Sequence, residues 1–239
     1  LVGLTTLFFF LSLDKERLEK APDFLRRLKW FSNYQEKTHD YQVIADSQKD
    51  KMLLSLIPKD RLKRMLEAML NESEFLSPNG IRALSKIHEN GYSEWIAGEQ
   101  FGLSYEPAES NSGLFGGNSN WRGPVWMPMN YLLIESLRSY FNYYGTSFNV
   151  EFPTGSGNLL NLNQIADELS KRLIGIFQED ASGNRPVNNY DPFYKEEHSK
   201  NLILFYEYFH GDNGRGVGAT HQTGWTGVVA ELIDKVYTK

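Results

Sequence analysis

The stretch WRGPVW at residues 121–126 places two indoles and a guanidinium within six residues, directly before a predicted helix. Indole rings stack on the apolar faces of sugar rings, and arginine and asparagine hydrogen-bond hydroxyl groups. The preceding loop adds Tyr105, Glu106 and Glu109, together with glycines and asparagines. This composition predicts a site for a polar, ring-shaped ligand. The predicted binding residues in this part of the chain are Tyr105, Glu109, Trp121, Arg122 and Trp126.

The same residues have a purely structural interpretation. A single tryptophan is more often a packed core residue than a ligand contact. Arg122 could equally hold the loop by pairing with Glu106 or Glu109. The composition leaves both interpretations open.

A second candidate is Glu207, which lies inside the apolar run LILFYEYF at residues 202–209. A carboxylate in such a run loses solvation, which raises its pKa unless a partner compensates and suits it to general acid or base catalysis. The alternative is a buried carboxylate paired with a base such as Arg215. Composition favours neither of the two.

Other chemistries find little support in the sequence. The glycines at 211, 214, 216 and 218 follow a predicted helix with the wrong spacing for a dinucleotide loop, so a mobile or ligand-approaching loop is expected. The five histidines show no metal-ligand spacing, and no Gly-x-Ser-x-Gly nucleophile motif occurs. We therefore expect no metal and no cofactor.

The charge balance argues against two classes of partner. A net charge of −5 without a basic block disfavours nucleic acid. The opening run LVGLTTLFFFLSLD is too short to span a bilayer and lacks the basic segment of a signal peptide, so no membrane contact is expected and the cytoplasm is favoured. We expect this run to be a core helix of a longer chain.

Helical periodicity dominates the remaining sequence. Apolar residues recur every three or four positions over residues 14–31, 61–70, 129–144, 165–177 and 226–236. Asn161, followed three residues later by Gln164, predicts a capping box. Pro124 or Pro128 is expected to begin the helix that Gly145 ends. The prediction is one all-α domain over residues 1–239, with long functional loops between the helices.

Two motifs carry a resemblance to a known family. NWRGPVWMPMNYL at residues 120–132 is similar to the Trp-Arg-Gly-Pro-Val/Ile-Trp segment of glycoside hydrolase family 63, which includes processing α-glucosidase I and mannosylglycerate hydrolases. The later FYEYF…TGWTG resembles the end of those enzymes. The whole chain resembles the C-terminal part of large bacterial family 63-like proteins.

The resemblance implies an (α/α)6 toroid, incomplete in this chain because roughly seven of twelve helices are counted. It implies hydrolysis of an α-glycosidic bond with inversion, with Glu207 as the general base. Trp121, Arg122, Trp126 and Trp225 would line the sugar subsite. The general acid of these enzymes is an Asp on an earlier segment with no match here, so the remainder of the catalytic domain from the same gene product is the expected partner.

Two alternatives to a glycosidase remain. The missing acid would also suit a non-catalytic helical module that binds carbohydrate or a protein. A purely structural helical domain predicts that the indoles and Glu207 are scattered over the surface.

Overall fold

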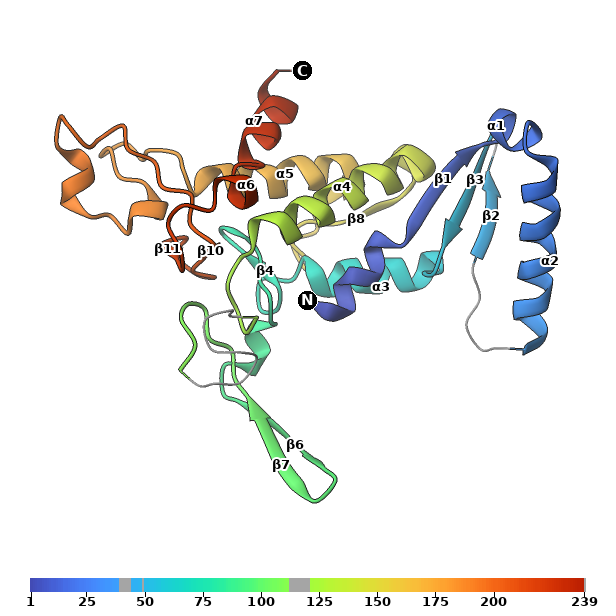
Figure 1. Ribbon diagram of the computed structural model, residues 1–239, viewed down its shortest axis with the longest axis horizontal. Coiled ribbons are helices and arrows are strands. Elements are labelled where there is room, and N and C mark those ends of the chain that lie inside the picture. Colours follow the sequence, from blue (N-terminus) through green and yellow to red (C-terminus); the bar gives the residue numbers. More distant parts are fainter. Residues whose placement is uncertain (39–43, 49, 112–120, 239) are drawn as a thin grey trace.

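The computed structural model describes residues 1–38, 44–48, 50–111 and 121–238 (Figure 1). The α-helices are α1 (Lys15–Glu19), α2 (Pro22–Thr38), α3 (Lys59–Met69), α4 (Met127–Tyr144), α5 (Leu162–Gly175), α6 (Thr223–Thr226) and α7 (Val229–Tyr237). The 3-10 helices are η1 (Val2–Phe8), η2 (Lys86–His88), η3 (Gly145–Ser147), η4 (Pro186–Asn188) and η5 (Pro192–Lys195).

The strands of the described residues form one three-stranded sheet and four hairpins, all antiparallel. The sheet has the order β1 (Phe10–Asp14), β3 (Lys51–Ser55), β2 (Ile44–Gln48). The hairpins are β4 (Leu76–Ser77) with β5 (Gly80–Ile81), β6 (Tyr92–Ile96) with β7 (Glu99–Leu103), β8 (Asn149–Glu151) with β9 (Leu159–Asn161), and β10 (Tyr208–Phe209) with β11 (Gly216–Val217).

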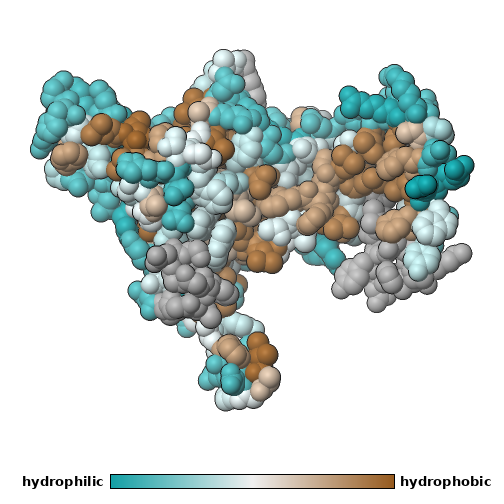
Figure 2. Space-filling model, in the orientation of Figure 1, coloured by the Kyte–Doolittle hydropathy of each residue, from teal (hydrophilic) through white to brown (hydrophobic). Residues whose placement is uncertain are grey.

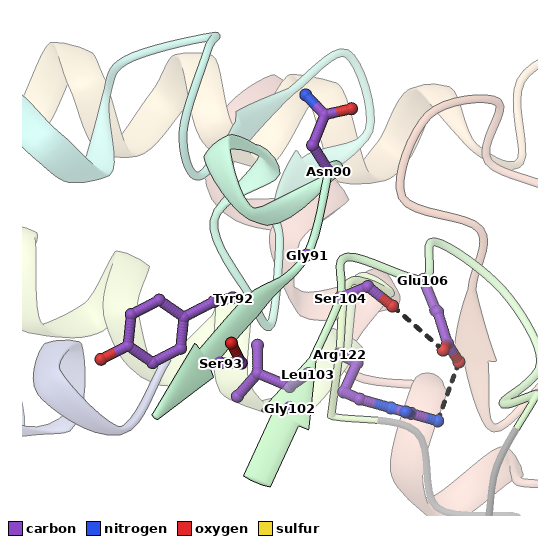
Figure 3. Close-up of a pocket in the computed structure, with 9 residues that line it drawn as sticks. All are labelled: Asn90, Gly91, Tyr92, Ser93, Gly102, Leu103, Ser104, Glu106 and Arg122. Carbon is purple, nitrogen blue, oxygen red and sulfur yellow. Dashed lines mark hydrogen bonds and ion pairs between the residues drawn. The ribbon is translucent and has the colours of Figure 1, made fainter. Parts of the chain in front are cut away.

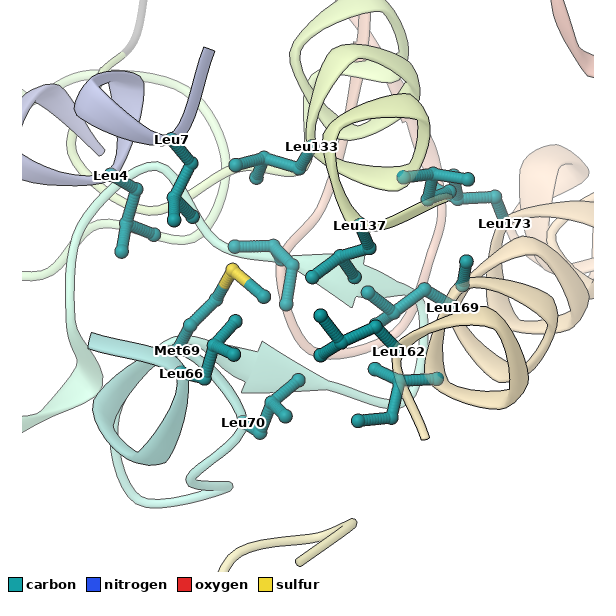
Figure 4. Close-up of a cluster of buried hydrophobic side chains, with 14 of the residues drawn as sticks. Leu4, Leu7, Leu66, Met69, Leu70, Leu133, Leu137, Leu162, Leu169 and Leu173 are labelled. Carbon is teal, nitrogen blue, oxygen red and sulfur yellow. The ribbon is translucent and has the colours of Figure 1, made fainter. Parts of the chain in front are cut away.

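The core lies where α3, α4 and α5 meet, and η1 closes one side of it. Figure 1 shows α4 and α5 side by side and running in opposite directions, and Figure 4 shows leucines of all four elements pointing toward one another. Leu66, Leu137 and Leu169 are completely buried. Burying one such side chain stabilises the fold by roughly 1.5–3 kcal/mol, so this cluster fixes the position of α4 and of the loop before it.

Several local predictions are confirmed. The Asn161 side chain accepts hydrogen bonds from the backbone N–H groups of Asn163 and Gln164, and the Gln164 side chain accepts one from the N–H of Asn161 at 3.0 Å. This is the predicted capping box. In α4, Pro128 lies in the first turn and Gly145 follows the last residue with φ +61°.

The prediction of an all-α fold is wrong, because the described residues are a mixture of helix and strand. The opening run folds as η1 followed by β1, whereas a single core helix was expected. Periodicity alone cannot distinguish a strand from a helix in so short an apolar run. The ladder of β1 with β3 decides the outcome.

Residues 202–207, treated as part of a helix from their sequence, are not helical. Phe205 bridges to His221, and Phe209 bridges to Val125. Glu207 lies at a bend directly before β10, between these two bridged positions.

Part of the apolar surface remains uncovered. Figure 2 shows apolar side chains gathered over β1 and β3, where Phe9, Leu11 and Leu56 are exposed. On α2, Phe24 and Phe31, two members of the predicted apolar stripe, are exposed, and so is Trp30. No described helix has the length and apolar character needed to cross a bilayer.

Candidate active site

Val125 forms β-bridges to Phe209 and to Arg82, which place the start of α4. Val125 exchanges two backbone hydrogen bonds with Phe209, each 2.9 Å long. On its other side, the N–H of Ala83 donates to the carbonyl of Pro124 at 2.9 Å. Trp126, the next residue, therefore lies beside β10, which begins at the residue after Glu207.

Three tryptophans and a tyrosine meet at this point. We call Trp121, Trp126, Tyr208 and Trp225 the aromatic cluster. The ring of Trp126 stacks on Trp121 at 4.3 Å and on Tyr208 at 4.7 Å, and it meets the edge of Trp225 at 6.3 Å. The hypothesis of scattered indoles in a purely structural domain is therefore wrong.

The members of the cluster differ in what they offer to a ligand. Trp126 is only 3% exposed, so it has little free ring surface and acts as the packed centre of the cluster. Trp121 is 36% and Trp225 is 38% exposed. The accessible indole surface of the cluster thus belongs to Trp121 and Trp225.

Glu207 is half-buried next to this cluster. Its backbone N–H donates to the carbonyl of Ala219 at 2.9 Å, and its own carbonyl accepts from the indole N–H of Trp225 at 3.0 Å. The hydroxyl of Thr226 donates to the carbonyl of Tyr206 at 2.6 Å. The Gly-Trp-Thr motif therefore fastens the backbone on which Glu207 lies.

The Glu207 carboxylate has one weak hydrogen bond, from the backbone N–H of Ala219 at 3.4 Å. Within the described residues no basic side chain pairs with it. The alternative in which Arg215 neutralises Glu207 is wrong, because Arg215 pairs with Glu109 instead. Gly218, with φ +76°, lies so close that a Cβ there would stand 2.8 Å from Glu207 Oε2.

Arg122 is 3% exposed, and its guanidinium pairs with Glu106 at 2.8 Å (Figure 3). It also donates to the hydroxyl of Ser110. This arrangement matches the loop-holding interpretation. Arg122 and Glu106 line a pocket of about 470 Å³ beside the β6–β7 hairpin, and Glu207 is not among the residues that line this particular pocket.

The two other predicted binding residues use their polar groups within the protein. The hydroxyl of Tyr105 accepts from Arg82 Nε and donates to Asp212 Oδ1, both at 3.1 Å. Burial raises the pKa of Tyr105. Both oxygens of Glu109 bind Arg215, at 3.1 and 2.7 Å, and this hydrogen bonding lowers the pKa of Glu109.

Sequence reasoning missed three residues that meet here. Arg82 is buried, and Asp212 accepts from it at 3.0 Å and lies 3.5 Å from Lys86. Arg82 and Lys86 precede Asp212 by about 130 positions and carry no motif, so only the mixture of polar and glycine residues in GDNGRG pointed to a structured turn. The glycines and asparagines of residues 112–120, part of the predicted ligand loop, lie outside the described residues.

A half-buried carboxylate that pairs with no basic side chain of the described residues, beside exposed indoles, defines a candidate carbohydrate-processing site. Comparison with family models matches residues 52–226 to a family described as the mannosylglycerate hydrolase MGH1-like glycoside hydrolase domain. The chain belongs to this glycoside hydrolase family. The WRGPVW motif, the FYEYF motif with its Gly-Trp-Thr, and the whole aromatic cluster lie within the matched range.

Curated relatives agree with this assignment. An uncharacterized protein of Saccharomyces cerevisiae is 42% identical over 248 residues, which cover 99% of this chain and 22% of that protein. A probable mannosyl-oligosaccharide glucosidase of Schizosaccharomyces pombe is 30% identical, over 78% of this chain and 17% of its own length. The mannosyl-oligosaccharide glucosidase of Saccharomyces cerevisiae is 25% identical, over 76% of this chain and 16% of its own length. The chain thus spans between 16% and 22% of the length of these relatives.

Proposed function

We propose that this chain supplies the general base and part of the sugar site of an inverting α-glycosidase. The observation that carries the proposal is the Glu207 carboxylate, which lies beside the aromatic cluster and pairs with no cationic side chain in the part of the chain that the structure describes. Such a carboxylate is free to accept a proton, whereas one held in a bidentate ion pair, as Glu109 is, gives up its charge only at a cost.

In the proposed reaction, Glu207 removes a proton from a water molecule as the water oxygen attacks the anomeric carbon. The bond from that carbon to the glycosidic oxygen breaks, and an acid from another segment of the same gene product protonates the departing oxygen. Inversion requires the two carboxyl groups to lie roughly 6.5–9.5 Å apart, with the water between them. An (α/α)6 toroid, of which α4, α5 and α7 would form part, is the proposed frame for both groups.

The proposed substrate is an α-glucoside at the end of an oligosaccharide. Two relatives bear the name mannosyl-oligosaccharide glucosidase, and the exposed faces of Trp121 and Trp225 suit the apolar side of a pyranose ring. Trp126 would support these indoles from beneath. Arg122, through Glu106, would hold the loop that carries Trp121.

The test is Glu207→Gln in the protein expressed from its whole gene. The amide keeps the shape of the side chain but cannot accept the proton of water, so turnover of an α-glucoside should fall by about 10²–10⁴ with little change in melting temperature. Glu151→Gln is the matched control, since that carboxylate also accepts a backbone N–H, from Gly155 at 2.6 Å, on a separate hairpin.

Retained turnover in the Glu207→Gln variant, together with an early melting transition, would assign Glu207 a structural role. The base would then be sought at Glu106 or Glu109. If the wild-type protein binds glucosides but releases no reducing sugar, the chain belongs to a binding module.

A further inference from the structure

The turn that follows β10 is tied down at several points. Its backbone is fixed by the N–H of Gly211, which donates to the carbonyl of Pro107 at 2.8 Å, and by the N–H of His210, which donates to the carbonyl of Arg215 at 2.8 Å. Gly211 packs so tightly that a Cβ there would lie 2.6 Å from the Tyr105 hydroxyl and 2.7 Å from the carbonyl of Gly123. The turn therefore lies directly against the loop that leads into WRGPVW.

Two ion pairs leave this turn in different directions. Asp212 binds the buried guanidinium of Arg82, and the Tyr105 hydroxyl joins both side chains. Arg215 binds Glu109 through two hydrogen bonds. The turn is thus connected to residues 82–86 on one side and to residues 105–109 on the other.

The same turn sets the position of Glu207. Glu207 immediately precedes β10, and β10 pairs both with β11 and with Val125. Asp212 lies three residues beyond the end of β10. A shift of the turn would move the β10–β11 hairpin relative to Val125 and so relative to Trp126.

We propose that Asp212 is a positioning residue, which, with Arg82 and Tyr105, anchors the β10–β11 turn and thereby fixes the Glu207 carboxylate beside the aromatic cluster. This inference rests on the proposed function, in which Glu207 is the base. Tyr105 and Glu109 accordingly act on the turn and do not contact the sugar. Asp212 is proposed to act through the position of Glu207, and it takes no part in proton transfer itself.

The test is Asp212→Asn in the protein expressed from its whole gene, which leaves the buried Arg82 without a charged partner. We expect kcat to fall about 10- to 100-fold with KM changed less than threefold, because a one-ångström displacement of a catalytic group has an effect of that size.

The matched control is Asp167→Asn. Asp167 pairs with Arg138 at 2.8 Å between α4 and α5, and its exposure is similar to that of Asp212, so its loss weakens the fold away from the turn. It should lower the melting temperature while leaving kcat unchanged. Equal losses of kcat in both variants would overturn a specific positioning role.

Hydrogen exchange separates this inference from the proposed function. In Asp212→Asn, amides of residues 204–217 should exchange at least tenfold faster while those of α5 stay as in the wild type, whether or not the protein hydrolyses glucosides. If amides of residues 204–217 in Asp212→Asn exchange as slowly as they do in the wild type, the anchoring role is overturned. If Asp212→Asn fails to fold, the test passes to Tyr105→Phe, which removes only the bridging hydroxyl. This variant should show the same faster exchange in residues 204–217 in weaker form. Unchanged exchange in Tyr105→Phe would overturn the inference.

Discussion

At the scale of single residues, three carboxylates close to one another in the fold have different surroundings. Glu109 is bound through both oxygens to Arg215, and Asp212 lies between Arg82, Lys86 and Tyr105. Glu207 alone has no basic partner among the described side chains. This difference, which residue types do not reveal, separates a candidate base from two carboxylates with structural partners.

The tryptophans of the aromatic cluster should divide into packing and binding residues. Trp126→Ala removes a buried ring and should lower the free energy of unfolding by about 3–5 kcal/mol. Trp225→Ala removes a partly exposed ring and should cost less stability but more affinity for an oligosaccharide. Urea unfolding and ligand titration of both variants measure this difference. Equal losses of stability in Trp126→Ala and Trp225→Ala would contradict the division.

Asp212 should contribute to the pH dependence of stability. Burial opposes its ionisation, but the hydrogen bond and charge of Arg82, with Lys86 and Tyr105, outweigh burial and lower its pKa. A lowered folded-state pKa gives stability that is present above the ordinary aspartate value of about 3.9 and is lost as the pH falls through the folded value.

The difference in unfolding free energy between wild type and Asp212→Asn should therefore be constant from about pH 7 to 5 and shrink below about pH 4. Urea titrations at these pH values measure it. A gap that widens on acidification would show that the Asp212 pKa is not lowered.

At the scale of elements, one side chain joins α4 to the β4–β5 hairpin. Asn130 is 1% exposed; its oxygen accepts from the N–H of Ile81 at 2.6 Å, and its amide donates to the carbonyls of Ile81 and Trp126 at 3.0 Å. It completes the hydrogen bonding of the hairpin as a neighbouring strand would. The first turn of α4, and with it the base of the aromatic cluster, thereby acquires a fixed position.

Asn130→Asp should lower the free energy of unfolding by more than about 2 kcal/mol, because a buried carboxylate would replace the amide that donates to the carbonyls of Ile81 and Trp126. Asn163→Asp is the control: the Asn163 oxygen accepts from Arg138 at 3.1 Å, and a carboxylate there would still accept. Chemical denaturation of both variants gives the comparison. Equal small losses would mean that the Asn130 amide contributes little.

At the scale of the whole molecule, the exposed apolar residues over β1, β3 and α2 form surfaces of a kind that usually contact another part of a protein. The relatives are about five times as long as the matched region. We expect the remainder of the catalytic domain to cover these surfaces and to supply the general acid.

Residues 1–239 expressed alone should therefore bind an apolar dye such as ANS more strongly, per mole, than the protein expressed from its whole gene. They should release no reducing sugar from an α-glucoside that the whole-gene protein hydrolyses. Fluorescence titration and a reducing-sugar assay check the two expectations. Full activity of residues 1–239 would place the acid within this chain.

The sequence by itself determined what depends on neighbouring residues. The Asn161 capping box, the helix that Gly145 ends and the buried stripe of α3 follow from spacing along the chain. The motif WRGPVW with FYEYF likewise indicated a glycoside hydrolase family, to which residues 52–226 belong. These features need no partner from a distant part of the chain.

Tertiary structure alone decided the remaining features. The opening run became a strand because β3, about 40 residues later, offered unpaired backbone groups to it. Arg215 paired with Glu109, so that Glu207 has no basic partner among the described side chains, and Arg82 met Asp212 across 130 residues. Hydrogen bonds and ion pairs between distant residues depend on which backbone segments come together, and residue type and spacing do not encode that choice locally.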